Sequence, residues 1–150
     1  MPIVSDLAQH SGYLLRMVSN AVSHQFARKL MREGVTVAEW VMLRSLYGNE
    51  GIAPSALAAK MGMTKGAISK LTDRLLEKGL IARTDNPTDK RGFSVSLSPA
   101  GAEKVPVLAR LADSNDAAFF GVMRCEEQAL LRSLLQTLIE KHALSTAPVD

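Results

Sequence analysis

The segment from Thr64 to Gly79 predicts a helix with one largely apolar side and one polar side. At 100° per residue, one side carries Ile68, Leu71, Thr72 and Leu75. The other side carries Lys65, Gly66, Ser69, Lys70, Asp73 and Arg74. Thr64 is a favourable N-cap and Gly79 favours a helix end, so both boundaries are marked. Such a helix suits the major groove of DNA, but an ordinary surface helix shows the same pattern.

The segments on either side favour the DNA-binding interpretation. Before the helix, Pro54 suits the first turn of a short helix that continues to Met61, and Gly62 lies in a tight link to the Thr64 cap. This order is that of a helix-turn-helix. After the helix, residues 80–84 and 93–98 predict two strands joined by a loop rich in turn residues. A hairpin placed directly behind a helix-turn-helix is a wing.

The predicted tip of this hairpin carries Asp89, Lys90 and Arg91. Arginine suits a narrow minor groove, where the negative potential is enhanced, and a neighbouring aspartate can hold its guanidinium in place. The alternative is a solvated loop whose charges only maintain solubility.

Helices are expected on both sides of this unit. The first runs from Ser5 or Asp6 to Glu33, and a second covers residues 37–47. A third begins at Pro99, and Pro106 should bend it or separate its first turns. We therefore predict a mainly α fold with a small β-hairpin wing. In this single structural domain a winged helix-turn-helix at 36–98 lies between long helical dimerisation regions at 1–35 and 99–150.

The last predicted helix follows Cys125 and has a wide apolar stripe. Leucine or isoleucine recurs in it at three- and four-residue steps, at positions 130, 131, 134, 135, 138 and 139. Little chain remains to cover such a stripe. It either docks on the first helix or is covered in a dimer built from both chain ends, and we favour the dimer.

The charge distribution agrees with a nucleic-acid partner. The net charge is +3, and residues 36–99 hold nine Lys or Arg against six acids, whereas residues 100–150 hold five against seven. The single cysteine cannot form an internal disulfide, which fits a reducing compartment. The N-terminus shows no secretion signal and no apolar run has membrane-spanning length, so we expect a cytoplasmic protein without a membrane partner.

The order of elements and the run from Thr64 to Gly101 resemble the MarR family of bacterial transcriptional regulators. The family's wing signature, Asp-x-Arg or Asp-Arg-Arg, appears here as Asp89-Lys90-Arg91, with lysine in the middle. The resemblance implies a homodimer on a pseudo-palindromic DNA site, acting as a repressor. It also implies that the first and last helices interlock at the dimer interface, for which we select Leu7, Leu14, Leu130, Leu134, Leu135 and Leu138.

Contacts with double-stranded DNA are assigned by residue type and position. Lys65, Ser69 and Lys70 are the candidates for base edges, and Gly66 allows close approach. Phosphate contacts, which set register rather than sequence, are expected from Thr64, Arg74 and Ser55. The wing residues Asp89, Lys90 and Arg91 complete the set.

The resemblance also implies release by a small phenolic or aromatic carboxylate effector. The candidate residues for such a ligand are Arg16, Asn20, Trp40 and Arg44. The two arginines would supply cations for the carboxylate, and the Trp40 indole would contact the aromatic ring. For Arg16, Asn20 and His24, which recur at four-residue spacing, a solvated strip is the alternative to a cleft lining. Core packing is the alternative for Trp40.

Other classes of function have little support in the sequence. The three histidines are scattered, and no HExxH, CxxC or glycine-rich phosphate loop occurs, so we expect neither an enzyme nor a metal or cofactor site. The remaining alternative is a winged-helix module that binds proteins and no operator.

Overall fold

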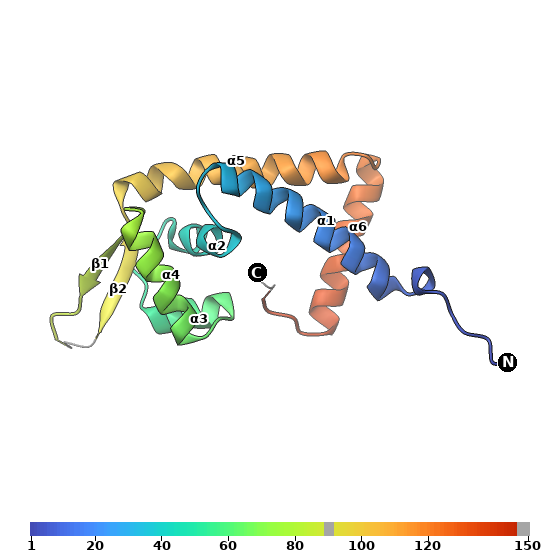
Figure 1. Ribbon diagram of the computed structural model, residues 1–150, viewed down its shortest axis with the longest axis horizontal. Coiled ribbons are helices and arrows are strands. Elements are labelled where there is room, and N and C mark those ends of the chain that lie inside the picture. The colour runs from blue at the N-terminus through green and yellow to red at the C-terminus, as the bar shows by residue number, and fades with distance from the viewer. Residues whose placement is uncertain (89–91, 147–150) are drawn as a thin grey trace.

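The computed structural model describes residues 1–88 and 92–146. In chain order the elements are the 3-10 helix η1 (Leu7–Gln9), α1 (Ser11–Arg32), α2 (Val37–Leu46), α3 (Pro54–Met61), α4 (Lys65–Glu77), β1 (Ile81–Asp85), β2 (Phe93–Leu97), α5 (Pro99–Phe120) and α6 (Cys125–Lys141). Helices α2, α3 and α4 form a lobe with the hairpin, while α1, α5 and α6 extend away from it (Figure 1). This arrangement confirms the predicted mainly helical fold with a hairpin wing.

The hydrophobic core lies in the lobe, where the helices converge. Its fully buried side chains come from α2, α3, α4, β2, the end of α1 and the first half of α5, and they include Leu30, Met42, Leu43, Leu46, Leu57, Ile68, Leu71, Leu75, Val95, Val105 and Leu108. The hairpin is attached to this core by a bridge in which Ile52 and Val95 exchange two backbone hydrogen bonds of 2.9 Å. The lobe therefore shares one core with the end of α1 and the first half of α5.

The outer helices are packed differently. Helix α1 lies along α5, and the Asn115 side-chain amide of α5 donates to the Val22 carbonyl of α1 at 3.2 Å. Helix α6 turns back from the far end of α5, and none of its residues is buried. The leucine stripe of α6 is thus left uncovered by α1 within one chain.

Two predicted boundaries are wrong, each for a local reason, and one of the two effects expected of Pro106 does not occur. Asp6 does not start α1. It caps the start of η1, where its backbone N–H donates to the Gln9 side chain at 2.7 Å. Extended backbone at His10 then separates η1 from α1. Leu80 is not a strand residue, because its N–H donates to the Leu75 carbonyl and completes the end of α4. Pro106 does not divide α5, which runs through it as one helix.

No helix among residues 1–88 and 92–146 combines the length and the apolar composition needed to cross a membrane.

The contact between the start of α5 and the end of α4 predicts a strong effect of one methyl group. A Cβ at Gly101 would overlap the Leu80 carbonyl oxygen, which is backbone and cannot rotate away. We expect Gly101→Ala to lower the free energy of unfolding by about 1–3 kcal/mol, as overpacking does. Urea denaturation at fixed protein concentration measures this change.

Gly12→Ala is the matched control, because a Cβ at this helical glycine meets no atom within 4 Å. It should be neutral or stabilise by roughly 0.5–1 kcal/mol. Equal effects of the two substitutions would contradict the proposed overlap.

Candidate nucleic-acid interface

The helix-turn-helix is formed by α3, the turn at Gly62 and α4. Gly62 adopts φ 65°, a left-handed conformation that glycine accepts without strain. The Thr64 hydroxyl oxygen accepts the Ala67 N–H at 3.1 Å, which confirms the predicted N-cap of α4. Gly79, at φ 72°, ends the helix as predicted. The turn and the cap together fix the direction in which α4 leaves α3.

The two sides of α4 differ in the way the sequence predicted. Ile68, Leu71, Thr72 and Leu75 are buried against the core. The candidate DNA contacts on α4 and its cap are all exposed, namely Thr64, Lys65, Gly66, Ser69, Lys70 and Arg74, and so is Ser55 at the start of α3. A Cβ at Gly66 would meet no atom within 4 Å, so a partner surface can approach the backbone there. The structure therefore leaves all of these side chains accessible, on the side of α4 away from the core and at the starts of α3 and α4.

The wing is an antiparallel hairpin in which Asp85 pairs with Phe93 and Ile81 pairs with Leu97. The Arg83 guanidinium lies 3.8 Å above the centre of the Phe93 ring, and its Nε donates to Asp85 Oδ1 at 3.0 Å. This stacked ion pair, which was not predicted from the sequence, joins the two strands at the stem of the wing. The predicted contacts Asp89, Lys90 and Arg91 lie outside the described residues.

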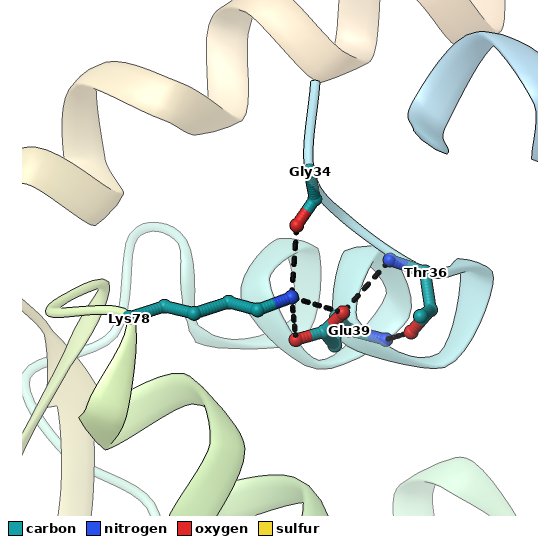
Figure 2. A network of polar contacts seen from close by, with 4 residues as sticks. All are labelled: Gly34, Thr36, Glu39 and Lys78. Carbon is teal, nitrogen blue, oxygen red and sulfur yellow. Dashed lines mark hydrogen bonds and ion pairs between the residues drawn. The ribbon is translucent and has the colours of Figure 1, made fainter. Parts of the chain in front are cut away.

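A buried carboxylate anchors the end of α4 to the start of α2 (Figure 2). Lys78 Nζ donates to Glu39 Oε1 at 2.9 Å and to the Gly34 carbonyl oxygen at 2.8 Å, and it lies 2.8 Å from Glu39 Oε2. The Glu39 side chain is 0% exposed, whereas that of Lys78 is 39% exposed. Glu39 Oε1 also accepts the Thr36 N–H at 2.8 Å, and Thr36 Oγ1 accepts the Glu39 N–H at 3.1 Å. These four residues form one connected polar network.

This network was not predicted from the sequence, although the contacts between Thr36 and Glu39 have a recognisable sequence pattern. The spacing Thr-x-x-Glu at the start of a helix is that of a capping box, and the structure contains both of its bonds. Nothing local links residue 78 to residue 39, because their contact depends on how α4 packs on α2.

Burial by itself would raise the pKa of Glu39 above its ordinary value of 4.5. The hydrogen bonds from Lys78 and Thr36, together with the charge of Lys78, outweigh the burial, and the net effect is a lowered pKa. The carboxylate is therefore ionised at neutral pH.

The four residues predicted to hold an effector make different contacts in the structure. Arg16 lines a cavity of about 360 Å³ with Leu7, His10, Gly12 and Tyr13 at the start of α1. Trp40 instead packs edge-on against Phe26, with ring centres 6.3 Å apart, and Arg44 lies over the Tyr47 ring. Asn20 and His24 are exposed on α1. Trp40 thus has the packing contact given as its alternative, and the four-residue effector set stays a prediction.

The residues selected for a dimer interface lie on the uncovered parts of the molecule. Leu7, Leu14, Leu130, Leu134, Leu135 and Leu138 are each between 36% and 66% exposed. Cys125, at the start of α6, is exposed as well.

The lowered pKa of Glu39 predicts a pH-dependent contribution to stability. A group whose pKa is lower in the folded state stabilises the fold above its unfolded pKa, and this contribution is lost as the pH falls through the folded value. We expect Glu39→Gln to unfold more easily than the wild type by about 1–3 kcal/mol at neutral pH. The difference should shrink as the pH falls below 4.5.

Denaturant titrations at a series of pH values measure this difference. Glu77→Gln, which removes a carboxylate from an exposed position at the end of α4, controls for general charge. A Glu39→Gln difference that persists unchanged in acid would show that the carboxylate acts through shape and not through charge.

Comparison with known proteins places this geometry in a family. A sequence model of the MarR family matches residues 35–93, which include α2, α3, α4 and β1. A protein described as a transcriptional regulator for the hcr operon of Thauera aromatica is 32% identical over 157 residues, covering 99% of this chain and 95% of that protein. The multiple antibiotic resistance protein MarR of Escherichia coli K12 is 33% identical over 91 residues, covering 61% of this chain and 63% of that protein.

Solved structures agree with these sequence matches. A mutant MarR from E. coli complexed with operator DNA superposes with a TM-score of 0.75 at 28% identity, covering 85% of this chain and 92% of that one. The apo form of wild-type MarR gives the same TM-score at 26% identity and covers 93% and 99% of the two chains. The first of these relatives is thus described as a transcriptional regulator, and one of the solved structures is bound to operator DNA. This chain belongs to the MarR family and is a DNA-binding transcriptional regulator.

Proposed function

We propose that this protein is a homodimeric repressor that binds a pseudo-palindromic operator in the cytoplasm. In each subunit α4 enters the major groove and the wing reaches the adjacent minor groove. The observation that carries this proposal is the separation of faces on α4, where a fully buried apolar side leaves Lys65, Ser69 and Lys70 exposed together. Backbone and phosphate contacts supply affinity, and side chains at base edges supply specificity.

Position along α4 assigns different roles to the exposed residues. Lys65, Ser69 and Lys70 lie in the N-terminal half of the helix, which is the part that recognition helices insert deepest, and we assign them to base edges. Arg74 lies a turn further on, and Thr64 and Ser55 lie at helix starts, so we assign these three to phosphates. Asp89, Lys90 and Arg91 are assigned to the wing contact.

The exposed leucines support a dimer built from the chain ends. No residue of α6 is buried, and Leu14, Leu15 and Val18 of α1 line an apolar cavity of about 470 Å³ with Phe119, Phe120 and Leu131. Apolar surface of this extent on a small protein indicates a covered interface. We assign Leu7, Leu14, Leu130, Leu134, Leu135 and Leu138 to it.

We further propose that a small phenolic or aromatic carboxylate releases the operator. Within one chain, support comes from Arg16, which lines its cavity together with Tyr13 and His10 and so combines a cation with aromatic rings. Asn20 is exposed on the same helix, whereas Trp40 and Arg44 contact other side chains.

The proposal predicts the symmetry of the DNA that the protein selects. Fragments bound from a random pool should contain two inverted half-sites about one helical turn apart, because a twofold dimer presents two α4 helices. Repeating the selection with salicylate, a small aromatic carboxylate, should reduce the bound fraction. A pool that stays random would contradict operator binding and favour a protein-interaction module.

The two classes of α4 contact predict different behaviour for Lys70→Ala and Arg74→Ala. Lys70→Ala should cost about 1–3 kcal/mol on the operator and relax the preference at one position of each half-site. Arg74→Ala should weaken binding to all sequences alike and reduce the salt dependence by about one ion per subunit. Affinities for the operator and its single-base variants, measured over a range of salt concentrations, separate these outcomes.

Lys141→Ala is the control, because it removes the same charge at the exposed end of α6, outside the proposed DNA contacts. If Lys70→Ala and Arg74→Ala both weakened all sequences equally, the assignment of Lys70 to a base edge would be wrong.

A further inference from the structure

The corner between α1 and α2, residues 33–39, is joined to two other helices by ion pairs. Lys78, at the end of α4, contacts Glu39 and Gly34 in this corner at 2.8–2.9 Å. Lys104 of α5 contacts Glu33 at 2.8 Å in the same corner. The corner therefore lies between the helix proposed to enter the major groove and the long helix that extends to the other end of the molecule (Figure 1).

The contact of Lys78 restricts the position of α4. Its ammonium group donates two hydrogen bonds, to Glu39 Oε1 at 2.9 Å and to the Gly34 carbonyl oxygen at 2.8 Å, and it lies 2.8 Å from Glu39 Oε2 in an ion-pair contact. Since hydrogen bonds weaken steeply outside a narrow range of distance and angle, a shift of α4 by about an ångström would break this arrangement. The end of α4 is thus held in one place relative to the corner.

The burial of Glu39 makes this restriction strong. A carboxylate that is 0% exposed cannot exchange its lysine partner for water. Removing one member of a buried pair leaves a desolvated charge, which is far costlier than losing a surface pair. The alternative positions of α4 that would separate Lys78 from Glu39 are therefore disfavoured.

We propose that the corner at residues 33–39 couples the position of α1 and α5 to that of α4, with Glu39 and Lys78 as positioning residues for operator binding. Neither side chain touches DNA in this proposal. Each acts by holding α4 at the angle and depth at which Lys65, Ser69 and Lys70 meet the groove. Glu33 and Lys104 connect the same corner to α5. The inference rests on the proposed placement of α4 in the major groove.

The test uses the sign of a charge effect. Glu39→Gln removes a negative charge, so electrostatics alone would strengthen DNA binding. Loss of positioning would instead weaken operator binding, and we expect a decrease of roughly 5- to 30-fold, the factor that corresponds to one or two kcal/mol. Glu77→Gln removes the same charge from an exposed position on α4 and should bind as tightly as the wild type or more tightly.

Two further variants test the pair and its link to α5. Lys78→Met should weaken operator binding with an unchanged salt dependence, because Lys78 makes no phosphate contact, and Lys78→Arg should recover most of the loss. Glu33→Gln should weaken binding by a smaller factor than Glu39→Gln, because the Glu33 side chain is 35% exposed. All affinities are measured with the full chain at a temperature where each variant is folded by circular dichroism.

Amide hydrogen exchange of the free protein provides a readout that does not depend on DNA. In Glu39→Gln the amides of residues 74–80 should exchange faster than in the wild type, while those of α3 should be unchanged. This measurement also separates the inference about Glu39 and Lys78 from the proposed operator binding. If the wild type selected no DNA, operator binding would be contradicted, and the exchange rates would still show whether the pair holds α4 in place.

Three results would overturn the inference. The first is operator binding by Glu39→Gln that equals or exceeds that of Glu77→Gln. The second is unchanged exchange at residues 74–80. The third is a Lys78→Met variant whose salt dependence falls by about one ion per subunit, which would make Lys78 a phosphate contact. A neutral Glu33→Gln would overturn the coupling to α5.

Discussion

The whole arrangement depends on the burial of the apolar side of α4. Ile68, Leu71 and Leu75 are each fully buried in the lobe, and a buried side chain of this size contributes about 1.5–3 kcal/mol relative to an exposed one. A helix held in this way has a fixed rotation about its axis. The opposite side must then face solvent, which is why Lys65, Ser69, Lys70 and Arg74 project from the protein together. The same packing therefore stabilises the fold and exposes the side that we propose to contact DNA.

Apolar burial determines the rotation of α4 but restricts its position along the axis less strictly. Hydrophobic contacts are non-directional, whereas a hydrogen-bonded ion pair has a defined geometry. Lys78 adds such a pair at the end of the helix, and the Thr64 cap adds a directional bond at its start. The wing follows directly from this end, because Leu80 closes α4 and Ile81 begins β1. Polar contacts at both ends of α4 thus complete the placement that the apolar side begins.

The two parts of the molecule bury apolar surface in different ways. The lobe has a closed core, whereas α6 has no buried residue and the first half of α1 is exposed. The exposed helix α1 leads directly into the corner at residues 33–39, and Lys104 of α5 contacts Glu33 in that corner, so a partner on α1 lies on a helix that is joined to the lobe.

Much of the fold was predictable because its signals are local. The turn at Gly62, the cap at Thr64, the second strand of the hairpin and the faces of α4 each depend on neighbouring residues, and the structure confirms them. The errors are also local. The cap at Asp6 and the hydrogen bond of Leu80 that ends α4 place the starts of α1 and β1 later than predicted. Pro106 lies within α5 without dividing it.

In the candidate site too, features that depend on neighbouring residues were predictable, and contacts between separate elements were not. The sequence by itself determined which residues form the exposed side of α4, since helical periodicity allows only one outcome once the apolar side is buried. Only the tertiary structure decided that Lys78 meets Glu39, that Arg83 stacks on Phe93, and that Trp40 packs on Phe26. The physical reason is that periodicity specifies the direction of a side chain from its own helix. Which group it meets depends on how separate elements pack, and no spacing in the sequence encodes that distance.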